Sequence, residues 1–261
     1  MLLEKGKTMT AIYGFTSKEK EIAFLFSDNL TQGIFYDESG KQKRFERRLD
    51  KIHIIGNRFA IAIIGNEITL DAIEGLKILN DPNNFTKSKD RVTSLDDLVN
   101  KIKDGTRLIC KSQNKVRDYT KNQPTKIVIL DCTEYELYEV DFGEDIPPNK
   151  LLKPTITNLP PDKLHFFALA AQAAKYEKNP PYLCINDDDI NSFEKIEKLM
   201  DEIFDFHRNI IKDKKIKQNG ITVSIGERGI YVLVKDDEIK YYSYYKTLND
   251  FILTRTTGIS Y

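Results

Sequence analysis

The sequence predicts an α+β protein in which two antiparallel sheets are stacked face to face and pairs of helices cover their outer faces. Strand-like and helix-like segments occur in the order strands, two helices, strands, two helices, strands. This order differs from the strand–helix alternation of a parallel sheet and favours separate layers of sheets and helices. A chain of 261 residues is also long enough to bury a large core. We expect one domain over residues 10–261.

Two hairpins are expected near the N-terminus. The β-prone runs TAIYGF (10–15) and EIAFLFS (21–27) are joined by a short polar linker. A charged stretch, residues 36–50, then predicts a solvent-exposed connection. Residues 51–65 contain two apolar runs separated by Gly56 and an asparagine, a pair that favours a tight hairpin turn.

The middle of the chain predicts two helices and two strands. Ile68, Ala72, Leu76 and Leu79 recur at helical spacing, and a second helix is expected over residues 94–116. The segments 125–131 and 135–142 have the character of paired strands. A proline-rich connection follows over 143–161.

The last third predicts two further helices and a final group of strands. The alanine-rich segment 165–177 is expected to form the third helix. Residues 190–213 carry an apolar stripe at helical spacing and form the fourth. The final strands are expected at 221–225, 230–235 and 239–246.

Composition argues against several classes of partner. The 40 basic and 40 acidic side chains cancel, so charge does not indicate a nucleic-acid or membrane-surface partner. The cysteines lack CxxC spacing, which argues against a zinc site and a disulfide framework. The acidic run 186–191 lacks the glycine and terminal glutamate of a calcium-binding loop. We therefore expect no metal and no cofactor. With no signal peptide or membrane span in the sequence, we expect a cytoplasmic protein.

Four segments of roughly the first eighty residues resemble a known family. TAIYGF, FLFSDNLTQG, DKIHII and AIAIIGNEITLDAI occur in the same order as similar segments of proteasome β-type subunits and of the bacterial heat-shock-locus peptidase. These proteins are N-terminal-nucleophile (Ntn) hydrolases. The resemblance implies a four-layer αββα sandwich and a mature chain that begins with a nucleophilic threonine. Over the remaining residues, only the order of secondary structure is similar.

The resemblance implies a catalytic set in this chain. Thr10 matches the nucleophile, Asp28 the aspartate after the second strand, and Lys51 the lysine before the third strand. Gly65 matches the glycine whose backbone N–H forms the oxyanion hole. An alignment without a gap would place Ser27 at the aspartate position. We prefer Asp28, because the mechanism needs a carboxylate.

Two segments of the second half depart from the family pattern. The serine–glycine-rich turn before the third helix is replaced by FFALAAQAA (166–174), which has no hydroxyl group. Asp213 lies near the place of a further supporting aspartate ahead of Gly220, but with longer spacing. We include Asp213 as possible catalytic support.

The chemistry explains why these residue types belong together. A threonine hydroxyl is a poor nucleophile and needs a base to take its proton. An α-amine titrates near pH 8, so the amine of Thr10 could serve as that base. A nearby Lys51 ammonium would favour the neutral amine, and Asp28 would hold that ammonium in place. No histidine is needed, and we expect His53, His165 and His207 to be structural.

A free amine requires that Thr10 begin the mature chain. Residues 1–9 are then either a leader or the result of a start placed too early, with Met9 the true start. Methionine aminopeptidase removes a methionine that precedes a small residue. Cleavage of a short propeptide is the alternative.

These expectations lead to three functional hypotheses. The first is a threonine-type peptidase within a homo-oligomeric, proteasome-like ring that acts on peptides or unfolded proteins, with an ATP-dependent unfoldase as a possible partner. The second is a catalytically inactive, proteasome-like structural subunit. The third is an enzyme of the same fold that hydrolyses a non-peptide amide.

Overall fold

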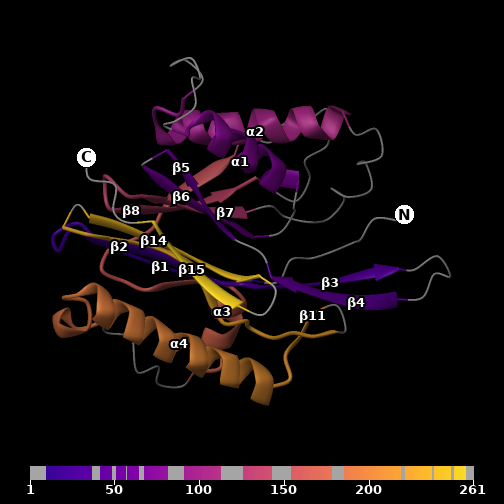
Figure 1. Ribbon diagram of the computed structural model, residues 1–261, viewed down its shortest axis with the longest axis vertical. Coiled ribbons are helices and arrows are strands. Elements are labelled where there is room, and N and C mark those ends of the chain that lie inside the picture. The colour runs from indigo at the N-terminus through magenta and orange to yellow at the C-terminus, as the bar shows by residue number, and fades with distance from the viewer. Residues whose placement is uncertain are drawn as a thin grey trace.

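The computed structural model reproduces the predicted order of strands and helices (Figure 1). It describes residues 10–36, 42–48, 51–56, 58–64, 68–81, 91–112, 126–142, 154–177, 185–218, 221–236, 238–247 and 250–256.

A six-stranded antiparallel sheet contains both ends of the described chain. In spatial order its strands are β10 (His165–Ala168), β1 (Ala11–Ser17), β2 (Ile22–Asp28), β13 (Arg228–Lys235), β14 (Glu238–Thr247) and β15 (Asp250–Thr256). The predicted first hairpin is confirmed, because β1 pairs with β2 and Ile12 lies opposite Ser27. All residues of β1 and β2 are buried, as expected for strands covered on both faces.

A five-stranded antiparallel sheet forms the second layer. In spatial order it contains β5 (Ile52–Ile55), β6 (Phe59–Ile64), β7 (Lys126–Asp131), β8 (Glu136–Asp141) and β9 (Thr155–Asn158). The predicted hairpin of β5 and β6 is confirmed, with Ile55 opposite Phe59. Gly56 adopts a φ of 59° at this turn, a conformation that glycine reaches without steric cost.

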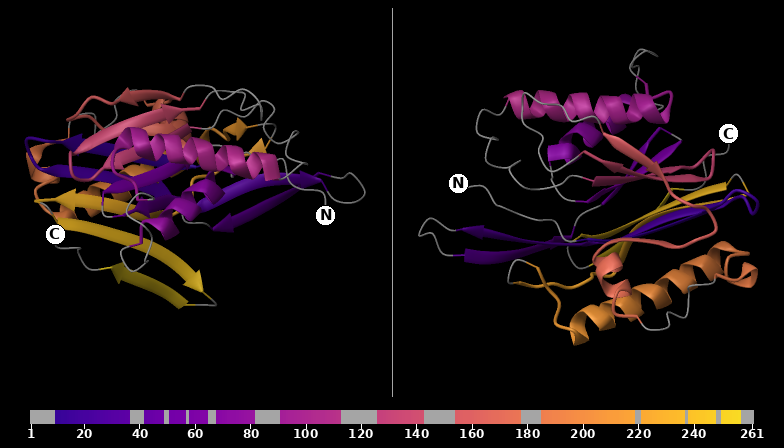
Figure 2. Two further views of the ribbon diagram at one scale, coloured as in Figure 1. Left: turned by 90° about the horizontal axis from the view of Figure 1, so that it is seen from above. Right: turned by 180° about the vertical axis from the view of Figure 1, so that it is seen from behind.

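Two helix pairs cover the outer faces of the stacked sheets (Figures 1 and 2). Helices α1 (Ile68–Leu79) and α2 (Leu95–Ser112) lie over the five-stranded sheet, while α3 (Leu169–Ala174) and α4 (Phe193–Asp213) lie over the six-stranded sheet. The chain therefore has a mixed α+β structure with two antiparallel sheets. None of the described helices combines the length and the apolar character needed to cross a membrane.

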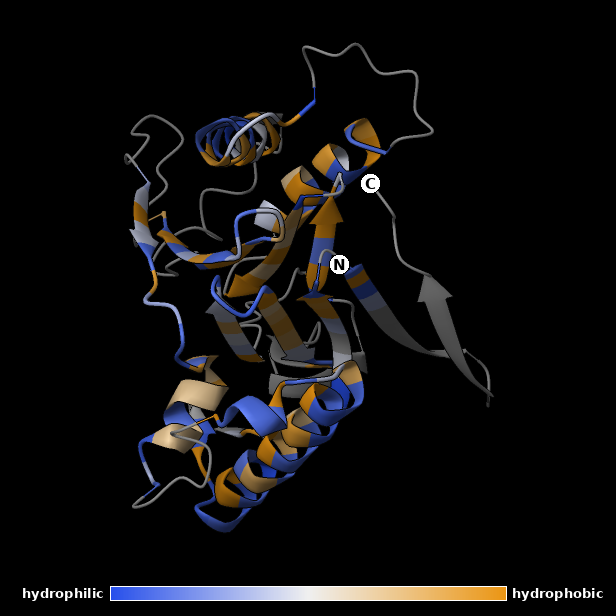
Figure 3. Ribbon diagram, turned by 90° about the vertical axis from the view of Figure 1, so that its left-hand side faces the viewer, coloured by the Kyte–Doolittle hydropathy of each residue, from blue (hydrophilic) through white to orange (hydrophobic). Residues whose placement is uncertain are grey.

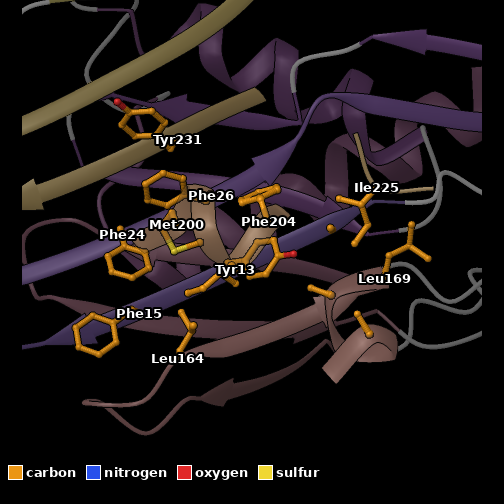
Figure 4. Packing of buried hydrophobic residues seen from close by; sticks show 14 of the residues in the cluster. Tyr13, Phe15, Phe24, Phe26, Leu164, Leu169, Met200, Phe204, Ile225 and Tyr231 are labelled. Atoms are coloured by element: carbon orange, nitrogen blue, oxygen red, sulfur yellow. The ribbon is translucent and has the colours of Figure 1, made fainter. Parts of the chain in front are cut away.

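Three apolar clusters lie between these layers. One cluster joins the six-stranded sheet to α3 and α4 (Figure 4). A second fills the space between the sheets, and a third joins the five-stranded sheet to α1 and α2. Helix α4 is amphipathic, with orange apolar and blue polar positions in Figure 3. Its buried residues recur at helical spacing, and they are Ile196, Met200, Ile203, Phe204, His207 and Ile211.

The structure corrects the prediction for the third helix. Residues 165–168 form strand β10 instead of the first turn, and α3 is limited to Leu169–Ala174. Strand β10 pairs with β1, so Phe166 lies opposite Tyr13. Pairing with the edge of a sheet outweighed the helical propensity of the alanine-rich segment.

Other connections also contain strands that the sequence did not predict. The charged stretch contains β4 (Gln42–Arg48), which pairs with β3 (Leu30–Tyr36) in a hairpin that extends beyond the two sheets (Figure 1). Strand β9 lies within the proline-rich connection, and β15 extends the first sheet. The strand expected at 221–225 is limited to β12 (Ile221–Thr222), paired with β11 (Lys217–Gln218).

Candidate active site

Three of the predicted site residues meet at one carboxylate. The Thr10 hydroxyl donates a hydrogen bond to Asp28 Oδ1 at 3.0 Å. Lys51 Nζ contacts the same oxygen atom at 2.8 Å. The Lys51 ammonium and the Thr10 hydroxyl are thus neighbours, joined by one shared acceptor.

The strand pairing explains how these residues come together. Thr10 directly precedes β1, and Asp28 is the last residue of the antiparallel partner β2. The two residues therefore lie at the same end of the hairpin. Lys51 directly precedes β5, in the other sheet. The cluster consequently spans both sheets of the structure.

The Asp28 carboxylate is also held by backbone groups. Ala11 N donates to Oδ1 at 2.8 Å, and Gly226 N donates to Oδ2 at 3.1 Å. Lys51 Nζ makes a further contact with the carbonyl oxygen of Leu30. A carboxylate with this many donors has a fixed orientation, which preorganises the groups around it.

The segment after Asp28 passes very close to the loop that contains Gly226. A Cβ atom at position 226 would lie 2.5 Å from Leu30 Cβ and 2.8 Å from the side-chain oxygen of Asn29. Only glycine fits this close approach. Sequence inspection missed the role of Gly226, because nothing in its own segment indicates what packs against it.

The cluster is buried, and burial determines its electrostatics. Thr10 is 1% exposed, Asp28 0% and Lys51 7%. Burial lowers the pKa of Lys51, while the neighbouring Asp28 carboxylate opposes that change. The contact between the two side chains therefore offsets part of the cost of burying Lys51.

A strained turn holds the backbone of Thr10. The N–H of Leu169, the first residue of α3, donates to the Thr10 carbonyl oxygen at 2.8 Å. Ala168, which pairs with Ala11, has φ 53° and ψ −118°. This conformation is unfavourable for a residue with a Cβ atom. This turn lies in the segment that replaces the serine–glycine-rich turn of the family. Its strained backbone could not be predicted from the sequence, because alanine, unlike glycine, does not indicate a positive φ.

The remaining predicted positions are not part of the contacts described above. Gly65 falls outside the described residues. Asp213 is exposed at the end of α4, in the outer helix layer, whereas the Thr10 cluster is buried where the sheets meet. Ser27, the alternative to Asp28, is buried, and its hydroxyl has no hydrogen-bond partner among the described residues. The contacts with Thr10 and Lys51 belong to Asp28.

No metal centre is visible in the described part of the chain, where no group of three or more His, Cys, Asp or Glu side chains could hold an ion. The acidic run at 186–191 contains a short 3₁₀ helix, Asp187–Asp189, that precedes α4. Lys20 contacts the first of these aspartates.

A scan against protein-family models and a search of the curated proteins find no match for this chain.

Proposed function

We propose that this chain is an N-terminal threonine amidohydrolase of the Ntn type, acting as a peptidase. The observation that carries the proposal is the shared carboxylate oxygen of Asp28, which contacts the Thr10 hydroxyl at 3.0 Å and Lys51 Nζ at 2.8 Å. A nucleophile, a buried cation and a fixed carboxylate are the groups that this chemistry uses. The stacked sheets between helix pairs are compatible with an Ntn-hydrolase fold.

The proposed reaction uses the α-amine of Thr10 as its base. Thr10 Oγ1 attacks the carbonyl carbon of the scissile bond, and the amine accepts the hydroxyl proton. The amine then delivers a proton to the leaving nitrogen, which leaves an ester between Thr10 and the acyl group. Water, deprotonated by the same amine, hydrolyses the ester and restores the hydroxyl. The backbone N–H of Gly65 is the proposed donor to the oxyanion.

Lys51 and Asp28 have supporting roles in this mechanism. The positive charge of Lys51 favours the neutral, basic form of the nearby amine. Asp28 holds Lys51 in place and accepts a hydrogen bond from the Thr10 hydroxyl before reaction, so the hydroxyl exchanges this hydrogen bond for one to the amine before it attacks. Neither residue needs to exchange a proton with the substrate.

The mechanism requires that Thr10 carry a free amine. In the printed sequence the nitrogen of Thr10 belongs to the peptide bond with Met9. We propose that this bond is absent from the active protein, either because Met9 is the initiating residue and is removed or because a short propeptide is cleaved.

The family resemblance also suggests how the protein assembles and which substrates it cleaves, and we include both in the proposal. A homo-oligomeric ring would enclose the active sites, admit peptides or unfolded proteins and receive them from an ATP-dependent unfoldase in the cytoplasm. Electron microscopy of the purified protein tests the ring directly. A monomer at micromolar concentration would contradict this part of the proposal.

The experiment that tests the proposal examines protein purified from its own cells. The N-terminal residue is identified by sequencing and intact mass, and the protein is treated with a peptide epoxyketone, which reacts with both the hydroxyl and the amine of an N-terminal threonine. We expect a chain that begins at Thr10 and carries one label.

Matched variants make the labelling result specific. Thr10→Ala should abolish the label, whereas Thr16→Ala should retain it, because Thr16 is an equally buried threonine at the other end of the same strand. Labelling of the Thr10→Ala protein would overturn the proposal.

An inactive structural subunit is the second candidate function. Two observations favour it, namely the 1% exposure of Thr10 and the absence of a hydroxyl group from the turn at Ala168 and Leu169. An intact N-terminal segment and no label, in a protein that still forms rings, would support this alternative. Hydrolysis of a non-peptide amide remains the third hypothesis, and labelling without any cleavage of peptides would favour it.

A further inference from the structure

A second buried polar cluster lies between the six-stranded sheet and α4. The Tyr13 hydroxyl and His207 Nδ1 are 3.0 Å apart, and His207 Nε2 contacts Glu177 Oε1. Tyr13 and the side chain of His207 are 0% exposed, and the side chain of Glu177 is 1% exposed. We refer to these three residues as the Tyr13–His207–Glu177 relay. Figure 4 shows the Tyr13 ring packed beside Phe204 in the same core.

The chemistry of the three side chains determines which atom donates and which accepts in each of their two hydrogen bonds. A carboxylate only accepts hydrogen bonds, so Nε2 of His207 carries the proton that is donated to Glu177. In a neutral imidazole Nδ1 is then the acceptor, and the Tyr13 hydroxyl donates to it. Burial lowers the pKa of His207 and raises the pKa of Tyr13, and both effects favour this neutral pair. The Asp28 charge also contributes to the raised pKa of Tyr13, so the relay lies within the electrostatic reach of the candidate site.

The relay and Thr10 belong to one closed loop of contacts. Tyr13 is on β1, three residues after Thr10. Glu177 follows the end of α3, and its own N–H donates to Ala174 O at 3.3 Å. At the other end of α3, Leu169 N–H donates to the Thr10 carbonyl. Helix α3 is thus attached to strand β1 at its start through Thr10 and at its end through the relay.

Aromatic contacts connect the relay to the strained turn. The ring of Phe166 packs edge-on against Tyr13 at 5.9 Å and against His207 at 5.2 Å. Phe166 is on β10, two residues before Ala168. The relay therefore contacts the strand that leads into the turn as well as the chain that leaves α3. A strained turn persists only where its surroundings hold it in place.

We propose that Tyr13, His207 and Glu177 are positioning residues for Thr10, which act by holding α3 so that Leu169 keeps its hydrogen bond to the Thr10 carbonyl. The catalytic consequence rests on the proposed function, whereas the effect on Leu169 does not. None of the three residues touches the reacting atoms.

The first test follows hydrogen exchange at the Leu169 amide by NMR in protein that need not be catalytically active. Tyr13→Phe removes only the hydroxyl and retains the packed ring. Loss of one buried hydrogen bond should lower the protection of this amide by about fivefold. The matched control is Tyr231→Phe. The Tyr231 hydroxyl donates to Glu197 on α4 at 2.6 Å from the same sheet and core, but this contact does not reach α3.

We expect the control to leave the protection of the Leu169 amide within about twofold of its original value, even if both variants lose similar global stability. An equal fall in both variants, or no fall in Tyr13→Phe, would overturn the proposal.

A second pair of variants keeps the test decisive if Tyr13→Phe folds poorly. Glu177→Ala should reproduce the fall in protection, whereas Glu177→Gln retains an oxygen acceptor for Nε2–H and should restore most of it. If Glu177 acted only through its charge, Glu177→Gln would not restore the protection of the Leu169 amide.

Epoxyketone labelling then measures the consequence for Thr10. In Glu177→Ala, the rate constant for labelling at saturating epoxyketone should fall about five- to tenfold. The epoxyketone concentration that gives half of the maximal rate should change little, because the substitution affects the chemical step and not the binding of the label. If the wild-type protein takes no label, the proposed function fails but the exchange result still decides the relay. If the wild type is labelled and all variants keep their Leu169 protection, the relay proposal fails alone.

Discussion

The backbone N–H of Gly226 donates a hydrogen bond to Asp28 Oδ2 at 3.1 Å, although 198 residues separate the two along the chain. Asp28 ends the second strand of the structure, and Gly226 lies just before β13, the neighbouring strand in the same sheet. The candidate site near the N-terminus therefore depends on a loop close to the other end of the chain.

Substitution of Gly226 by alanine should destabilise the protein and disturb Asp28. The new Cβ would lie 2.5 Å from Leu30 Cβ, so the segment must shift, at a cost of about 1–3 kcal/mol of unfolding free energy. Urea unfolding measures this cost. Gly75→Ala is the control, because Gly75 is an exposed helical position with nothing within 4 Å of an added Cβ, and it should gain about 0.5–1 kcal/mol. Equal effects of the two substitutions would contradict the tight packing at Gly226.

Replacement of Ala168 by glycine should stabilise the protein. The backbone at Ala168, φ 53° and ψ −118°, costs a residue with a Cβ atom about 1–3 kcal/mol. Glycine relieves this strain. It also lowers the free energy of unfolding by about 0.5–1 kcal/mol, because the unfolded chain gains conformational freedom at a glycine. We expect a net gain of about 1 kcal/mol in urea unfolding. Ala173→Gly, at the penultimate and fully buried position of α3, should instead lower stability. A loss at position 168 would show that the strain is absent.

Lys51→Met should be strongly destabilising. It would leave the fully buried Asp28 carboxylate without its cation, and breaking a buried pair costs about 3–5 kcal/mol. The hydrogen bonds from Thr10, Ala11 and Gly226 remain, so we expect about 3 kcal/mol by urea unfolding.

A matched pair and a double variant test this interpretation. Lys101→Met breaks a more exposed ion pair with Asp97, at i and i+4 of α2, and should cost no more than about 0.5 kcal/mol. Adding Asp28→Asn to Lys51→Met should recover part of the loss, because no uncompensated charge is then buried. Additive losses would be evidence against the pairing.

His207 should make stability sensitive to mild acid. Burial lowers the pKa of His207, so below its ordinary value of about 6.5 the unfolded chain binds a proton that the folded chain does not. The free energy of unfolding then falls as pH decreases, by at most about 1.4 kcal/mol per pH unit. Urea unfolding between about pH 7 and pH 5.5 measures this slope.

His207→Gln removes the titrating ring and should flatten the decrease. The pKa of His165 is also lowered by burial, but that ring is only partly buried, so His165→Gln should change the slope less. A slope that is unchanged by His207→Gln would mean that His207 does not titrate differently in the folded state.

Most elements could be predicted because their signals are local. The spacing of Ile68, Ala72 and Leu76 predicted α1, and the pair at Gly56 predicted the turn between β5 and β6; both are confirmed. The alanine-rich segment from residue 165 was wrongly predicted as entirely helical. Its first four residues fill the edge of the sheet beside β1, a position that no local preference indicates.

In the candidate site, too, some residues could be predicted from the sequence and others could not. Thr10, Asp28 and Lys51 were selected by residue type and by resemblance, and the structure brings these three side chains together. Gly226 and the Tyr13–His207–Glu177 relay were not selected. His207 was expected to be a structural residue, and its partners come from two distant segments that carry no motif.

The sequence by itself determined the α+β class, the order of strands and helices, and the chemical groups available for catalysis. These properties depend on periodicity, turn residues and side-chain type, which act over a few neighbouring positions. Only the tertiary structure decided which donors surround Asp28, where α3 begins, and that α3 is attached to β1 at both ends. Those features are hydrogen bonds between segments up to 198 residues apart, several of them from backbone groups that every residue type carries.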